Sequence, residues 1–166
     1  LLPMKSHLHL LLTIAIILSG CTSRQSKHVY KQEFITTNAT KLIKDGKPYH
    51  YIGCNIWYAS ILGSTGTGGD RDRLCRELDQ LQDLGVTNVR ILSGPDAGSL
   101  LANPAKPYLQ TAPGVLNDTL LEGLDYVIAE LDKRDMDAVI YLNNAWDWSG
   151  GYGFYLKECG YGDPPN

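Results

Sequence analysis

The sequence predicts an α/β fold in which helices cover a parallel sheet, and two observations support this prediction. Short β-favouring apolar runs alternate with helical patterns in the order strand, helix, strand, helix, strand. Helices rather than tight turns connect these runs, and parallel strands require such crossovers. An Asp45-Gly46 pair between two β-favouring runs predicts a hairpin ahead of this unit. With 166 residues, the chain is long enough for one domain or for part of a larger one.

The first unit of the predicted sheet is a strand that continues from the hairpin through residues 51–56 and ends at Trp57 and Tyr58. The glycine-rich stretch 63–69 follows, and it lacks the Gly-Lys-Ser/Thr ending of a phosphate-binding loop, so we expect a plain flexible connection. Asp70 is placed to cap the next helix. The apolar face of this helix and its glycine stop are Leu74, Leu78, Leu81, Leu84 and Gly85.

Two further strands are predicted at residues 86–92 and 137–144, separated by a proline-containing loop and a helix over residues 119–134. Thr119 and Glu122 have the spacing of a capping box at the start of this helix. Asp135 occupies the turn after the helix, where we expect left-handed backbone. The buried stripe of this helix is predicted to be Leu120, Leu124, Val127, Ile128 and Leu131.

The start of the chain predicts export. Residues 1–3 precede Met4 and resemble an upstream remnant, and residues 4–20 form a signal peptide whose apolar run is too short to span a bilayer. The stretch that ends at Cys21 resembles a bacterial lipobox, so we expect a lipid on Cys21, a tether over residues 21–32 and a folded part over 33–166. An ordinary signal peptide with a chance cysteine is the alternative. The expected location is the outer membrane or the cell surface, or else the extracellular medium.

Composition and cysteine spacing exclude some functions. The net charge of −3 provides no basic surface for nucleic acid. No Cys/His spacing indicates zinc, and we assign no catalytic role to any histidine. With Cys21 lipidated, three cysteines remain, and we expect Cys54 and Cys75 to be buried and unpaired because each lies in an apolar pattern.

Polar and aromatic side chains gather where the predicted strands end, which is where parallel α/β folds carry their chemistry. Indoles offer flat apolar faces to the C–H patches of a sugar ring, while amides and a guanidinium can bind its hydroxyls. The sequence therefore predicts a carbohydrate cleft. The alternatives are packing roles for the tryptophans, a structural ion pair for the arginine and strand termination for the paired asparagines. The residues concerned are Asn55, Trp57, Tyr58, Arg90, Ser93, Asp96, Asn143, Asn144, Trp146, Asp147 and Trp148.

With these residues in place, the chain resembles glycoside hydrolase family 5, and specifically its bacterial endo-β-1,4-mannanases. The resemblance covers most of residues 42–162 and rests on the stretches "DGKPYHYIGCNIWY", "DRLCRELDQLQDLGVTNVRIL", "LQTAPGVLNDTLLEGLDYVIAELDKRDMDAVIYLNNAWDWSGG" and "YGFYLKECGYG". It implies a (β/α)₈ TIM barrel, of which this chain would hold the first three βα units after a β-hairpin. It further implies retaining hydrolysis of internal β-1,4-mannosidic bonds, with β-mannan or a related plant polysaccharide as the partner and no metal or organic cofactor.

The resemblance also implies residue roles. Arg90 would support the catalytic nucleophile, Trp57 and Trp146 would stack on sugar with Trp148 beside them, and Asn143 or Asn144 would bind hydroxyls. The family uses two glutamates, one after the fourth strand within an Asn-Glu pair and one after the seventh. This chain has no Asn-Glu pair. Its glutamates fall in the leading segment, on helices or in a late loop: Glu33, Glu77, Glu122, Glu130 and Glu158.

We therefore expect an N-terminal piece that lacks both catalytic glutamates and is inactive by itself. Two other functions fit the same residues. One is a non-catalytic surface lipoprotein that binds glycans, since an anchor and an aromatic cleft would serve it equally well. The other is a different family 5 β-glycanase such as an endo-glucanase, because the residues at the strand ends discriminate poorly between mannose and glucose.

Overall fold

The computed structural model describes residues 34–162, in two units that divide after Pro48. The expected remnant, signal peptide, Cys21 and tether lie outside the described residues. No helix within residues 34–162 is long and apolar enough to cross a membrane.

The first unit is an antiparallel meander of β1 (Thr36–Asn38), β2 (Lys41–Lys44) and β3 (Lys47–Pro48). The predicted hairpin is confirmed: Asp45 and Gly46 connect β2 to β3 with φ of 51° and 73°, as a tight hairpin turn requires. β1 was not predicted, because Ala39-Thr40 lacks a common turn signature although Ala39 adopts a φ of 51°. The hairpin was also wrongly continued into the next strand, since β3 ends at Pro48.

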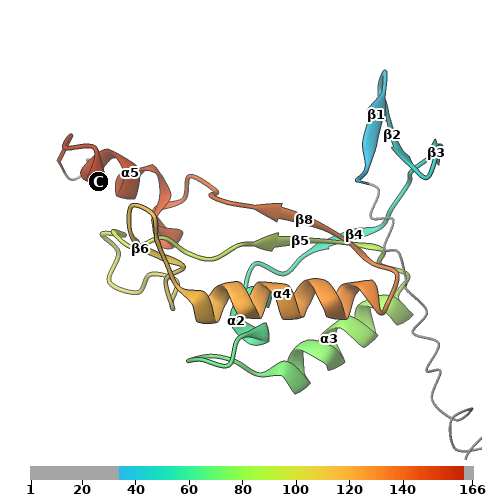
Figure 1. Cartoon of the computed structure of the whole chain (residues 1–166), viewed down its shortest axis with the longest axis horizontal. Coiled ribbons are helices and arrows are strands. Elements are labelled where there is room, and N and C mark those ends of the chain that lie inside the picture. The colour runs from blue at the N-terminus through green and yellow to red at the C-terminus, as the bar shows by residue number, and fades with distance from the viewer. Residues whose placement is uncertain (1–33, 163–166) are drawn as a thin grey trace, which may run out of the picture. The chain divides into compact units, whose positions relative to one another are not determined.

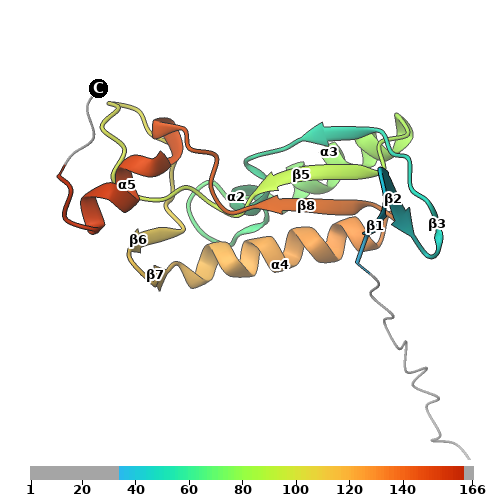
Figure 2. The ribbon, with the colours of Figure 1, turned by 90° about the horizontal axis from the view of Figure 1, so that it is seen from above.

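The second unit contains the predicted parallel sheet, formed by β4 (Gly53–Asn55), β5 (Asn88–Leu92) and β8 (Asp137–Tyr141) in that order (Figures 1 and 2). The register aligns Asn55 with Arg90 and Arg90 with Val139. Because facing residues of parallel strands point to the same side of a sheet, these three side chains share one face. The chain order of the strands is preserved in space, as in successive units of a barrel.

Three helices cover the opposite face: α2 (Ala59–Gly63), α3 (Arg71–Asp83) and α4 (Asp118–Asp132). In Figure 1, α3 and α4 lie on the same side of the sheet. Val89 and Ile91 point toward these helices and are fully buried, whereas Arg90 between them is exposed. The residues buried in this core are Ile56, Ala59, Leu62, Leu74, Leu78, Val86, Val89, Ile91, Val127, Leu131 and Met136.

The helix ends confirm some predictions and correct others. Asp70 caps α3 by accepting a hydrogen bond from the Arg73 backbone N–H, and left-handed backbone occurs at Gly85 and Asp135 as expected. The predicted capping box is wrong: the side chain of Asn117 caps α4. The fourth leucine assigned to the apolar face of α3, Leu84, is 74% exposed because it lies beyond the last helical turn.

Several short elements were not predicted. Besides α2, these are the hairpin of β6 (Gln110–Ala112) and β7 (Val115–Leu116), the 3₁₀ turn η1 (Asp147–Ser149) and the helix α5 (Gly151–Glu158). Glu158 therefore ends a helix instead of lying in a loop. Figure 1 shows β6 and α5 beyond the carboxyl ends of β5 and β8.

All three cysteines of the described region are unpaired, as expected for Cys54 and Cys75. These two are half-buried rather than buried, and Cys159 is exposed. Burial raises the pKa of the Cys54 thiol, which keeps it protonated at neutral pH.

A glycine contact sets the closest approach between α2 and α4. A Cβ on Gly123 would lie 2.3 Å from the backbone oxygen of Ser60, and one on Gly63 would lie 2.3 Å from the backbone oxygen of Gly123. Both obstacles are backbone atoms, which cannot move out of the way as a flexible side chain could.

We expect Gly123→Ala to lower the free energy of unfolding by about 1–3 kcal/mol, as overpacking does. Helix propensity alone predicts the opposite sign, a gain of up to about 1 kcal/mol. Urea unfolding followed by circular dichroism measures the difference. Asp125→Ala, at an exposed position of the same helix, is the matched control and should be nearly neutral. A Gly123→Ala variant as stable as this control would contradict the proposed close approach.

A buried carboxylate connects the outer surfaces of α3 and α4. Glu130 is 5% exposed and contacts Lys133 and Arg134, and Arg134 also reaches Asp79 on α3 at 2.6 Å. Hydrogen bonds from Lys133 and Arg134 lower the pKa of Glu130 to about 2. Since this pKa is below the value of the unfolded chain, about 4.3, the carboxylate stabilises the fold fully above that value and loses its contribution as the pH falls toward 2.

Replacing Glu130 with Gln should therefore flatten the dependence of stability on pH. Between pH 5 and 2 we expect the parent protein to lose roughly 1–3 kcal/mol more unfolding free energy than the variant. Urea titrations at several pH values provide the measurement, with Glu158→Gln, at an exposed position, as the control. Parallel stability curves for the parent and the Glu130→Gln variant would show that this group is not the titrating one.

Candidate functional site

The exposed face of the sheet carries a guanidinium. Arg90 is the central residue of β5 rather than near its end, and it is level with Asn55, the last residue of β4. Its Nη1 donates a hydrogen bond to Asn55 Oδ1 at 3.2 Å, and its Cζ lies 3.5 Å from the ring centroid of Tyr141. The aromatic ring and the amide thus hold the guanidinium in one orientation.

Arg90 has no ion pair within residues 34–162. The alternative of a structural ion pair therefore finds no support there. Arg90 also lines a hollow, together with Tyr51, Val139 and residues of β4 and β5. Because a guanidinium has five N–H donors and only one donates to a described side chain, the rest can bind an incoming carboxylate or hydroxyl.

The three tryptophans form a second cluster. Trp57, just after β4, and Trp148, in η1, meet edge to face with ring centroids 4.5 Å apart. Trp146 lies 6.4 Å from Trp148 and is 68% exposed, while the other two are half-buried. An edge-to-face pair is a stabilising arrangement, so Trp57 and Trp148 form a packed base while Trp146 offers its ring to solvent.

The paired asparagines shape the loop that carries Trp146, residues 142–150, which we term the Trp146 loop. Asn143 Oδ1 accepts from the Ala145 backbone N–H at 2.6 Å. Asn144 Oδ1 accepts from the backbone N–H of Trp146 at 3.0 Å and from the Ser149 hydroxyl at 2.7 Å. Both side-chain oxygens are thus used inside the loop, which favours a structural role for them. The Nδ2 group of Asn144 has no hydrogen bond to another described residue and remains available to a ligand.

A buried carboxylate lies beneath this loop. Asp96 is 4% exposed and accepts hydrogen bonds from Tyr155 at 2.9 Å, Asn143 at 3.2 Å and Gln110 at 3.4 Å. Burial and the hydrogen bond to Asp96 raise the pKa of Tyr155, so this phenol remains a donor throughout the neutral range. From the sequence, Asp96 was expected just beyond the end of the second strand, without a particular role.

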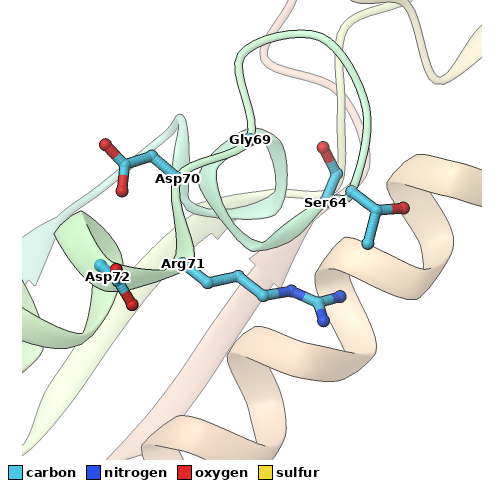
Figure 3. Close-up of a pocket in the computed structure, with 6 residues that line it drawn as sticks. Ser64, Gly69, Asp70, Arg71 and Asp72 are labelled. Atoms are coloured by element: carbon cyan, nitrogen blue, oxygen red, sulfur yellow. The ribbon is translucent and has the colours of Figure 1, made fainter.

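A different hollow lies at the start of α3 and is lined by residues of the 63–69 stretch and the first residues of the helix (Figure 3). Two of its charged groups, Arg71 and Asp70, are already engaged. Arg71 extends toward α4, where it forms an ion pair with Glu122 at 2.8 Å, and Asp70 caps the helix. Glycines here permit close packing: a Cβ on Gly69 would lie 2.1 Å from the Ser64 backbone oxygen. The stretch is therefore a packed connection.

The structure brings the predicted residues together in two groups rather than one. Arg90 joins Asn55 and Tyr141 on the open sheet face, while the tryptophans and both asparagines lie in the loops beyond it. Tyr141 was missed because its contact with Arg90 depends on sheet register, which the sequence does not show. No cluster of His, Cys, Asp or Glu suited to a metal ion occurs within residues 34–162.

These features define a class of protein: an α/β protein whose parallel sheet has helices on one face and candidate site residues toward its carboxyl edge, where α/β barrels carry their active sites. Residues 32–160 match the sequence model of the glycoside hydrolase family 5 β-mannosidase-like proteins. The chain belongs to this family.

Comparisons with individual proteins support the same family. A protein of Oryza sativa subsp. japonica from the mannan endo-1,4-β-mannosidase group is 31% identical over 157 residues, 95% of this chain and 36% of its own length. The family 5 mannosidase of Rhizomucor miehei, solved as a mutant in complex with mannosyl-fructose, is 31% identical with a TM-score of 0.69 over 75% of this chain and 30% of its own. The endo-1,4-β-D-mannanase of Thermotoga petrophila RKU-1 is 25% identical with a TM-score of 0.50 over 68% and 31%.

The structural neighbours are (β/α)₈ barrels, so the three parallel strands and their helices are part of such a barrel. The chain spans about a third of the length of the relatives it matches.

Proposed function

We propose that this chain is part of a retaining endo-β-1,4-mannosidase and forms one wall of its mannan-binding cleft. The observation that carries the proposal is the 68% exposed ring of Trp146, on a hydrogen-bonded loop at the carboxyl edge of the sheet. Family membership supports it, as do the mannan-degrading relatives. An indole on an ordered loop can stack on a pyranose at little entropic cost, because its position is already fixed before binding.

In this proposal Arg90 supports the nucleophile electrostatically. Retaining hydrolysis requires an acid/base and a nucleophilic carboxylate roughly 5–5.5 Å apart. We assign both to βα units that the relatives have beyond the region matched here. Asn55 and Tyr141 would hold the guanidinium in place while it faces the nucleophile, so that no reorganisation is needed as charge develops. The chemistry of paired carboxylates uses no metal or organic cofactor.

An exo-acting β-mannosidase is a second candidate. The Rhizomucor miehei mannosidase superposes with a TM-score of 0.69, against 0.50 for the Thermotoga petrophila endo-mannanase. The two modes differ in where the substrate chain can extend beyond the cleavage point. Analysis of the products that the complete gene product releases from mannan separates the two modes. Mannose alone indicates exo action, and a ladder of oligosaccharides indicates endo action.

The deciding experiment measures binding of mannohexaose and cellohexaose, by calorimetry, to the complete gene product that contains this chain. We expect binding of the mannan oligosaccharide, weakened about tenfold by Trp146→Ala because a stacking face is lost. Circular dichroism should show this variant folded, since the ring is exposed. Phe34→Ala, which removes a ring that is 84% exposed in the first unit, is the matched control.

Equal affinity for both sugars would favour another family 5 β-glycanase. No binding of either sugar would overturn the proposal. The gene product that contains this chain is then tested on mannan. Binding without hydrolysis by that complete product would favour a non-catalytic glycan-binding lipoprotein.

We further propose that the protein is exported and anchored through a lipid on Cys21. The support is the basic start and apolar run followed by Ser19, Gly20 and Cys21. In a bacterial host we expect radiolabelled palmitate to be incorporated into the protein and lost in Cys21→Ser. Incorporation that survives this substitution, or none in the parent protein, would contradict the anchor.

A further inference from the structure

Asp96 carries a buried carboxylate, yet no Lys, Arg or His side chain within residues 34–162 forms an ion pair with it. It is 4% exposed, and its three hydrogen-bond donors are the neutral groups of Gln110, Asn143 and Tyr155. Burying a carboxylate costs free energy unless several donors compensate it. Asp96 is buried despite this desolvation cost, and its carboxylate accepts hydrogen bonds from separate segments. An apolar residue could not make these contacts.

The contacts of Asp96 connect the Trp146 loop with β6 and α5. Its backbone N–H donates to the Ser149 carbonyl at 3.0 Å, and its backbone forms a bridge with Gln110 on β6. The hydrogen bond from the Tyr155 hydroxyl connects Asp96 to α5. Gly150, with a φ of 96°, packs so closely that a Cβ would lie 2.6 Å from the Asp96 carbonyl oxygen. The loop that follows β5 thus holds the loop that follows β8.

A short chain of hydrogen bonds leads from this carboxylate to the backbone of Ala145, the residue before Trp146. The Nδ2 group of Asn143 donates a hydrogen bond to Oδ2 of Asp96. This bond orients the Asn143 amide so that its oxygen accepts from the Ala145 backbone N–H. Ala145 has a φ of 60°, which an alanine adopts only under constraint. The next residue is Trp146.

We propose that Asp96 is a positioning residue for sugar binding: through Asn143 and Tyr155 it fixes the Trp146 loop so that the indole is presented in a ready-made orientation. It acts through the loop and does not itself touch substrate. The description of Trp146 as a sugar-stacking group rests on the proposed function, whereas the mechanical link from Asp96 to the loop does not.

The geometry predicts different results for two substitutions. Asp96→Ala removes all three acceptor contacts. Asp96→Asn can keep its oxygen toward Asn143 and Tyr155 and present its amide to Gln110. This substitution loses only the hydrogen bond from Gln110. The Gln110 amide cannot turn its oxygen toward the new Asn amide without losing its bond from the Gly114 backbone N–H at 3.0 Å. Asn should therefore restore the loop, although it removes the charge.

A fluorine NMR experiment tests the link without any ligand. The chain contains three tryptophans, so the protein labelled with 5-fluorotryptophan gives three resonances that single substitutions can assign. We expect Asp96→Ala to move and broaden the Trp146 resonance, and Asp96→Asn to bring it back close to the parent position. Asp72→Ala, at an exposed aspartate on α3, is the matched control and should change nothing.

Binding of mannohexaose then tests the consequence through a double-mutant cycle. Asp96→Ala should weaken binding about tenfold in the parent protein but leave the Trp146→Ala protein unchanged, because the residue acts through that indole. An equal loss in both backgrounds would overturn the proposal, as would an unchanged Trp146 resonance in Asp96→Ala or failure of Asp96→Asn to restore it. If the parent binds no mannan oligosaccharide, the proposed function fails, while the NMR result still decides the role of Asp96. Should Asp96→Ala fail to fold, Tyr155→Phe removes one donor and should produce a smaller shift of the same resonance.

Discussion

The packing of α2, α3 and α4 on one face of the parallel sheet is the constraint from which the other features follow. Alternation along β5 sends Val89 and Ile91 into this packing and forces Arg90 to the opposite face. The strand register places Asn55 beside Arg90. The ring of Tyr141, the last residue of β8, packs against the Arg90 guanidinium. The ordered guanidinium is thus a consequence of where the helices lie. The glycine contact between α2 and α4 contributes by letting those helices approach closely.

The candidate site residues are divided between a strand of the sheet and a loop. Arg90 lies on a central strand, where sheet hydrogen bonds fix the backbone. Trp146 lies on a loop, where backbone hydrogen bonds must come from elsewhere. In this protein they come from two asparagine side chains, and through Asn143 from a buried carboxylate. A loop held in this way presents its aromatic ring in a defined orientation.

The open face and the free edges of β4 and β8 agree with membership of a barrel family. Parallel sheets are normally covered on both faces, and the strands of a closed barrel have no free edge. Here Ile52 is 61% exposed and Val139 46% exposed. Both lie on or beside strands that, in the relatives, belong to a complete ring. The exposed apolar surface and the polar groups around Arg90 therefore mark the interior of a barrel rather than an outer surface.

The parallel α/β order, the hairpin at Asp45-Gly46, the Asp70 cap and the left-handed turns at Gly85 and Asp135 could all be predicted from the sequence. These features depend on local periodicity and on the backbone preferences of single residues, which remain the same in any tertiary context. The sequence also named Arg90 and the three tryptophans as site candidates, and these assignments stay predictions.

Only the tertiary structure decided how these residues are grouped. The stacking of Tyr141 on Arg90 requires the register of two strands about fifty positions apart in the chain. The role of Asp96 requires four segments to meet at one carboxylate, and the replacement of Thr119 by Asn117 as helix cap depends on how the β6–β7 hairpin enters α4. Contacts between distant segments leave no periodic trace in a sequence, because each partner is locally compatible with many neighbours, and packing alone selects among them.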